Sequence, residues 1–142
     1  GLVEGAVEDG AELLTGGHAP EGAGNYFEPT VLDRVPPKAR ITGTEIFGPI
    51  AAIQRFDDED EAIARANDTE FGLAGYVFTE SLDRAFRAAD RLETGLVGIN
   101  QGVPSNAAAP FGGVKQSGLG REGGAEGLEE YQNIRFYNIA SR

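Results

Sequence analysis

The sequence predicts an α/β fold built on a parallel or mostly parallel sheet. Three apolar runs with the composition of buried strands, 50–56, 73–79 and 96–100, are separated by two amphipathic helical patterns. Strand, helix, strand, helix, strand at this spacing describes two βαβ units, which form parallel sheets with right-handed crossovers. We therefore expect ligands to bind at the rim of this sheet, as they do in other open α/β folds.

The first third of the sequence predicts one helix and two extended segments. One face of the helix is apolar and carries Leu2, Val3, Ala6 and Val7. Gly10 is placed to end this helix in a left-handed conformation. Residues 11–15 predict a short buried strand, and 26–35 predict an edge or bent strand because Pro29 has no N–H for a central ladder.

Charged residues and a glycine mark where the two crossover helices begin and end. Asp57 and Asp58 provide an N-cap and favourable negative charge for the first helix. The second helix has the stronger pattern, an apolar stripe made of Leu82, Ala85, Phe86, Ala89 and Leu92. We expect Gly95 to end this helix just before the strand 96–100.

The last third of the sequence predicts a long loop, a short helix and a terminal strand. Residues 101–120 are rich in Gly, Ser, Pro and Ala. A loop of this length in a compact domain is typical of a functional segment, because ordering its backbone costs entropy. A helix is expected around 122–130, followed by a strand at 132–139 whose edge needs a partner.

Composition excludes several classes of function. The net charge of −11 disfavours a nucleic-acid partner, which requires a clustered basic surface. No apolar run approaches the roughly 20 residues that cross a bilayer, and no signal peptide opens the sequence, so we predict no membrane partner and a cytoplasmic location. With no Cys and the single His18, the segment provides neither a thiol nucleophile nor a predicted metal site.

Three residues near strand ends are candidates for ligand contacts. Glu45 precedes a Gly-Pro turn at the head of a strand, and an ionised carboxylate there can accept hydrogen bonds from both hydroxyls of a ribose. Phe47 could press its face against a flat heterocycle; the alternative is a turn with a solvated Glu and a core Phe. Asn100 could offer its amide to a ligand or could simply form a turn.

Four motifs, in this order and spacing, resemble the aldehyde dehydrogenase superfamily. They are E-x-F-G-P at 45–49, N-x-x-x-F-G-L-A at 67–74, G-x-V-x-I-N at 95–100 and P-F-G-G-x-K-x-S-G-x-G-R-E at 110–122. The last is not a phosphate-binding P-loop, because its spacing does not match G-x-x-x-x-G-K-[ST]. The resemblance covers nearly the whole sequence.

The resemblance implies a role for each of these segments. Glu45 looks like the residue that holds the nicotinamide-ribose hydroxyls of NAD or NADP, with Phe47 packed near that ribose and the nicotinamide. Asn100 and the loop after it look like part of the aldehyde pocket, and 111–121 looks like its buttress, with Phe111 in the pocket. It implies a catalytic-domain segment over 1–130 and, over 131–142, an oligomerisation strand and tail that join a neighbouring subunit in a homo-oligomer.

The loop from Asn100 to Gly113 is most similar to that of succinate-semialdehyde dehydrogenases. In that group a Ser of this loop helps to hold the far carboxylate of the substrate, which makes Ser105 the first candidate and Asn106 the second. Pro104 departs from the pattern, and so does Thr44, which stands where an acidic residue often precedes the Glu.

The same resemblance places the nucleophilic Cys, the general-base Glu, the oxyanion Asn and the dinucleotide-binding domain upstream of these motifs. We therefore expect no catalytic residue in this segment, and a segment that is inactive by itself. Two alternatives remain: a stand-alone assembly or binding module that uses the terminal strand, and part of a CoA-acylating semialdehyde dehydrogenase. Neither the choice between NAD and NADP nor the aldehyde is decided by these residues.

Overall fold

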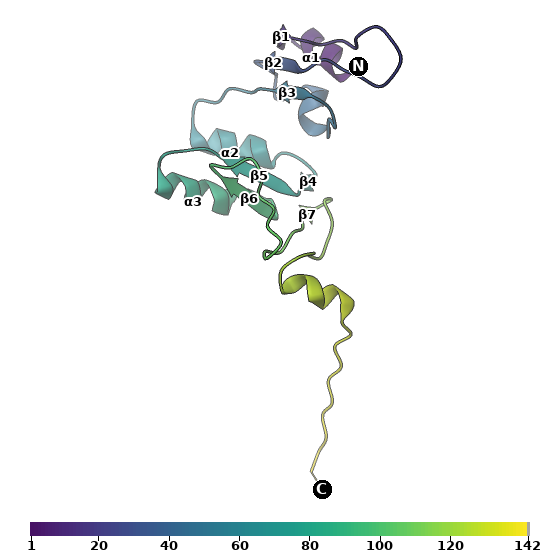
Figure 1. The fold of residues 1–142 in the computed structure, drawn as a ribbon. Coiled ribbons are helices and arrows are strands. Elements are labelled where there is room, and N and C mark those ends of the chain that lie inside the picture. The colour runs from purple at the N-terminus through teal and green to yellow at the C-terminus, as the bar shows by residue number, and fades with distance from the viewer. Residues whose placement is uncertain (142) are drawn as a thin grey trace. The chain divides into compact units, whose positions relative to one another are not determined.

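A computed structural model describes residues 1–141, which form two compact units divided after Asp68. Figure 1 labels the helices and strands of both. The elements of the first unit are α1 (Leu2–Glu8), β1 (Glu12–Thr15), β2 (Thr30–Asp33), the 3₁₀ helix η1 (Arg40–Gly43), β3 (Ile50–Ala52) and α2 (Glu59–Asn67). Those of the second unit are β4 (Phe71–Gly72), β5 (Ala74–Val77), α3 (Leu82–Arg91), β6 (Leu96–Ile99), β7 (Val114–Lys115) and the 3₁₀ helix η2 (Glu126–Tyr131).

The first unit is built around a three-stranded sheet in the order β1-β2-β3. The first pair is antiparallel and the second is parallel, with Thr30 opposite Ile50. Its core is formed by apolar residues from α1, β2 and the segment through η1: Val3, Ala6, Ala11, Leu32, Val35, Ala39 and Ile41. The predicted apolar face of α1 is thus confirmed at Val3 and Ala6, whereas Val7 is exposed.

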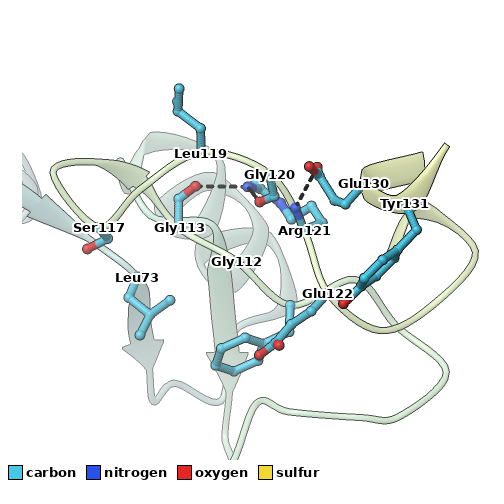
Figure 2. A pocket seen from close by; sticks show the side chains of 11 residues that line it. Leu73, Gly112, Gly113, Ser117, Leu119, Gly120, Arg121, Glu122, Glu130 and Tyr131 are labelled. Carbon is cyan, nitrogen blue, oxygen red and sulfur yellow. Dashed lines mark hydrogen bonds between the residues drawn. The ribbon is translucent and has the colours of Figure 1, made fainter. Parts of the chain in front are cut away.

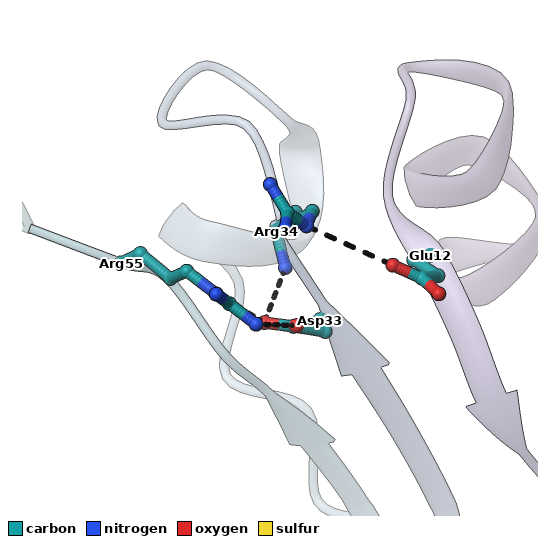
Figure 3. Close-up of polar contacts among 4 residues, drawn as sticks. All are labelled: Glu12, Asp33, Arg34 and Arg55. Carbon is teal, nitrogen blue, oxygen red and sulfur yellow. Dashed lines mark hydrogen bonds and ion pairs between the residues drawn. The ribbon is translucent and has the colours of Figure 1, made fainter.

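A buried carboxylate joins the end of β2 to the segment that follows β3 (Figure 3). Asp33 accepts hydrogen bonds from Arg55 Nη2 at 2.5 Å and from the backbone N–H of Arg34 at 2.8 Å. The guanidinium of Arg55 and this N–H hold the pKa of Asp33 below its usual value. Backbone bonds from Ile53 to Leu32 and from Val35 to Ile53 continue the pairing past β3, so the predicted strand at 50–56 is shorter but correctly placed.

The second unit contains a βαβ unit. β5 and β6 pair in parallel from Ala74 opposite Leu96 to Val77 opposite Ile99, and α3 crosses between them. Ala85 on α3 is buried, whereas Phe86 is 57% exposed, so the packed face of the helix is narrower than the predicted stripe. α3 ends at Arg91, before the expected Gly95.

The α/β class is confirmed, whereas the parallel or mostly parallel sheet built from both predicted βαβ units stays a prediction. Asp58 caps α2 by accepting from the N–H of Glu61 at 2.8 Å, as the sequence predicts. In the described part of the chain, however, β3 pairs with β2 and β5 pairs with β6, in separate sheets. Helix spacing predicts a crossover but does not choose the neighbouring strand, because consecutive strands are adjacent in only about two-thirds of cases.

The end of the chain departs from the predicted pattern in three places. The loop 101–120 contains β7, which pairs antiparallel with β4, and Phe111 pairs with Glu122. The expected helix at 122–130 is the shorter η2. The expected strand at 132–139 has no ladder partner among the described residues; this stretch is extended and exposed (yellow in Figure 1). A strand exists only where a second strand supplies its hydrogen bonds, which accounts for the difference.

No helix in the described part of the chain is long and apolar enough to cross a membrane.

Candidate functional site

The turn before β3 presents a carboxylate and an aromatic ring on the surface of the first unit. Ile46 is half-buried against the core, and its neighbours Glu45 and Phe47 are exposed on either side of it. The start of the turn is fastened by Thr44, whose hydroxyl donates to the carbonyl of Arg40 at 2.8 Å. The core contact of Ile46 therefore holds the turn while the two flanking side chains stay accessible.

Phe47 is not a core residue. The alternative interpretation, a turn with a solvated Glu and a core Phe, is therefore wrong about Phe47. Its side chain is 92% exposed, and its backbone has φ of +39°. A left-handed conformation in a non-glycine residue costs free energy and is over-represented where a side chain is held for a ligand. The carboxylate of Glu45 forms no hydrogen bond with the described residues, so its oxygens remain available as acceptors. An acceptor pair beside an open ring fits a ribose diol next to a flat heterocycle.

Asn100, at the end of β6, forms a structural link. Its Oδ1 accepts from the backbone N–H of Thr79 at 2.9 Å, and its Nδ2 donates to the carbonyl of Thr79 at 2.9 Å. Its φ of +53° turns the chain out of the strand. This reciprocal pair joins the ends of β5 and β6, so the geometry favours the turn interpretation over a direct ligand contact.

Three of the predicted pocket residues surround one hollow in the second unit. The hollow has a volume of about 290 Å³ and is lined by Ser105, Asn106, Ala107, Ala109, Phe111, Glu122 and Gly123. Asn106 Oδ1 accepts from the N–H of Ala108 at 2.9 Å, which shapes the turn and leaves the amide N–H groups as donors. The hydroxyl of Ser105 makes no hydrogen bond with the described residues. The walls thus offer three polar residues, Ser105, Asn106 and Glu122, and the aromatic ring of Phe111, and Asn100 is not among them.

A second hollow of about 360 Å³ lies next to the first, since both are lined by Phe111 and Glu122. Figure 2 shows its walls, which also include Ser117, Leu119, Arg121, Glu130 and Tyr131. The last two residues were not predicted as site residues. The sequence carried no signal for them, because they follow the glycine-rich motif and lie beyond Gly123 and Gly124, two glycines with positive φ.

The polar residues of the glycine-rich motif bind the protein itself. Lys115 donates to the carbonyl of Thr69 at 3.2 Å and forms an ion pair with Glu93. Ser117 Oγ accepts from the N–H of Gly72 at 2.9 Å. Arg121 donates to the carbonyls of two loop glycines. Both cations of this motif, Lys115 and Arg121, therefore have partners within the protein. The motif holds the pocket wall in place and is not built as an anion site.

Comparison with known proteins assigns this chain to a family. The sequence profile of the aldehyde dehydrogenase family matches residues 1–137. A succinate-semialdehyde dehydrogenase of Paenarthrobacter nicotinovorans is 52% identical over 139 residues, which make up 98% of this chain and 31% of that protein. A glutarate-semialdehyde dehydrogenase of Pseudomonas putida is 52% identical over 138 residues, or 97% of this chain and 28% of that protein.

Solved structures agree with the sequence comparison. An NADP-dependent enzyme of E. coli has a TM-score of 0.88 at 52% identity, over 92% of this chain and 27% of that one. A Mycobacterium tuberculosis aldehyde dehydrogenase complexed with NAD⁺ has a TM-score of 0.84 at 43% identity, over 91% of this chain and 27% of that one. This chain spans less than a third of the length of the curated relatives named above, 31% and 28%.

Proposed function

The chain belongs to the aldehyde dehydrogenase family, and from this premise we propose that its residues bind cofactor and substrate in an NAD(P)-dependent oxidation of an aldehyde to a carboxylic acid. The observation that carries the proposal is the turn at Glu45 and Phe47, where an unpaired carboxylate and a 92% exposed ring are held by a core contact. An assembly module would have no use for such a pair.

In this proposal Glu45 binds the two hydroxyls of the nicotinamide ribose and Phe47 orients the ring system beside it. The cofactor, when bound, supplies the hydride acceptor. The 142 residues contain no Cys, so the thiol that attacks the aldehyde in this family is not among them. The segment contributes binding and positioning, and the nucleophile belongs to other residues of the enzyme.

We further propose that the substrate is a semialdehyde with a carboxylate at its far end. The hydroxyl of Ser105 and the amide N–H groups of Asn106 are donors suited to carboxylate oxygens. Two relatives carry the names succinate-semialdehyde dehydrogenase and glutarate-semialdehyde dehydrogenase. The two semialdehydes in these names differ in length by one methylene group. The only charged residue that lines this hollow in the described chain is Glu122, so a cation that neutralises the substrate carboxylate must come from residues outside the hollow.

Glu45→Gln tests the cofactor contact in the complete enzyme that carries this segment. Loss of the charge weakens the bonds to both ribose hydroxyls, so we expect kcat/KM for the cofactor to fall about tenfold or more, with an unchanged melting temperature. The measurement is steady-state formation of NAD(P)H, together with thermal unfolding of each variant.

Glu8→Gln is the matched control, because Glu8 is an exposed carboxylate of the same unit with no hydrogen bond to the described residues. It should behave as the parent enzyme. If the Glu45 variant binds cofactor and turns over as the parent does, Glu45 is only a solvated turn residue and the proposed cofactor contact is wrong.

We also propose that residues 132–139 pair with a sheet edge of a second copy of the chain. Apolar side chains here face solvent, with Ile134 94%, Phe136 86% and Ile139 87% exposed. Exposed apolar area on an extended backbone with open hydrogen-bonding groups is suited to strand addition. Deleting 132–142 should shift the chain toward monomer in sedimentation velocity, whereas deleting only 140–142 should leave its association unchanged. An oligomer that survives the longer deletion would place the contact elsewhere.

A further inference from the structure

The glycine-rich loop from Gly113 to Gly120 is tied at both ends by one side chain. Arg121 Nη1 donates to the carbonyl of Gly113 at 2.8 Å and to the carbonyl of Gly120 at 2.7 Å. Glycine-rich segments lose much conformational entropy on ordering, so a single bridging cation has a large influence on this loop. Arg121 therefore fixes the two ends of the loop, while Ser117 and the pairing of β7 with β4 hold its middle.

Glu130, on η2, holds the backbone of Arg121 in place (Figure 2). Its Oε1 accepts from the N–H of Arg121 at 3.2 Å. The same carboxylate lies directly against Gly120, where an added Cβ would stand 2.7 Å from Oε1 and where φ is +81°. The end of the Glu130 side chain thus lies beside a backbone position whose positive φ favours glycine. Its neighbour Glu129 is exposed and its side chain makes no hydrogen bond with the described residues.

Glu122, the residue after Arg121, connects Arg121 to the wall of the pocket. Glu122 donates its backbone N–H to the carbonyl of Phe111 at 2.8 Å and accepts the N–H of Phe111 at 2.6 Å. Phe111 and Glu122 line both hollows of the second unit. A continuous set of bonds therefore runs from the carboxylate of Glu130, through Arg121, to the residue pair that forms the pocket wall.

We propose that Glu130 is a positioning residue for the aldehyde pocket: it fixes Arg121, and through Arg121 it fixes the Phe111–Glu122 pair. The role of the pocket in this statement rests on the proposed function, whereas the link itself does not. Glu130 touches neither substrate nor cofactor in this proposal, and its effect on the reaction passes entirely through the pocket wall.

Amide hydrogen exchange of the 142-residue chain tests the link without any activity. In Glu130→Ala the amide of Arg121 loses its acceptor and must exchange faster whatever the role of Glu130. The decisive reporters are the amides of Phe111 and Glu122, which donate to each other's carbonyls and not to the substituted carboxylate. We expect their exchange to rise about tenfold, because a bond to a charged group that restrains them is gone.

Two further variants complete the test. Glu130→Gln keeps an acceptor oxygen and should restore most of the protection, leaving a rise of about threefold at Phe111 and Glu122. This variant decides the matter if Glu130→Ala does not fold. Glu129→Ala removes a carboxylate from the same helix and should leave exchange at Phe111 and Glu122 unchanged. If both Glu130 variants alter only the amide of Arg121, the carboxylate is a local surface contact and the proposal is overturned.

In the complete enzyme, the KM for the semialdehyde should rise several-fold in Glu130→Ala, whereas kcat and the KM for the cofactor stay within about twofold. A displaced pocket wall weakens substrate binding and leaves the turn at Glu45 as it is. Equal loss of kcat and cofactor binding would indicate a general loss of structure and would contradict the positioning role. If the parent enzyme oxidises no semialdehyde at all, the proposed function fails while the exchange result still decides the link.

Discussion

Gly95→Ala should destabilise the chain by about 3 kcal/mol or more, at the upper end of what an overpacked site costs. A Cβ at this position would stand 1.8 Å from the carbonyl oxygen of Gly112 and 2.9 Å from the Cα of Gly113. All the nearest atoms are backbone, so no side chain can turn away to make room. Gly95 also donates its N–H to the carbonyl of Gly72 at 3.0 Å, which fixes it between β4 and the pocket wall.

Thermal and urea unfolding of the purified chain measure this effect. For a unit of this size we expect the melting temperature to fall by more than about 10 °C. Gly102→Ala is the matched control in the same unit, because an added Cβ there has nothing within 4 Å. A Gly95 variant that melts within about two degrees of the parent would show that the pocket wall can move away from β6 at little cost.

The 142-residue chain alone should form no NAD(P)H from succinate or glutarate semialdehyde with either cofactor. Oxidation in this family requires a nucleophile that attacks the aldehyde before hydride leaves, and the chain has no thiol to serve as one. We expect the rate of NAD(P)H formation to equal that of the buffer without protein. A complete loss of activity relative to a whole enzyme is the largest effect among the predictions. Absorbance of the reduced cofactor is the measurement, with the intact mass of the sample verified.

The succinate-semialdehyde dehydrogenase of Paenarthrobacter nicotinovorans, assayed in parallel, controls for substrate quality. Reduced cofactor above the no-protein rate from the verified chain would contradict the prediction. It would mean that another side chain of these residues acts as the nucleophile, and the hydroxyl of Ser105, unpaired in the pocket, would be the first to replace with Ala.

Much of this protein follows from its sequence alone. Asp58 caps α2, and a βαβ unit forms over 74–99, because capping and apolar periodicity are local properties of the chain. The spacing of the four motifs was enough to indicate the family that the comparisons show. Ser105, Asn106 and Phe111 line one hollow, as expected of neighbours in one loop.

Other features were decided only by the tertiary structure. The local pattern assigns Gly95 to a helix end. In the structure a glycine is required at this position because the backbone of Gly112 packs directly against it. The sequence does not show that Arg121 donates to two carbonyls of its own loop. Likewise, the amide of Asn100 is occupied by Thr79. In each case the partner is chosen by how distant segments meet in space.

The strands show the same limit. Extended backbone is encoded locally, but which strand lies beside it is not, because the hydrogen bonds that make a sheet come from another segment. That is why 96–99 became a strand against β5 while 132–139, equally extended, has no ladder partner among the described residues. Sequence determines what a segment is able to form, and the presence of a complementary edge decides whether it forms.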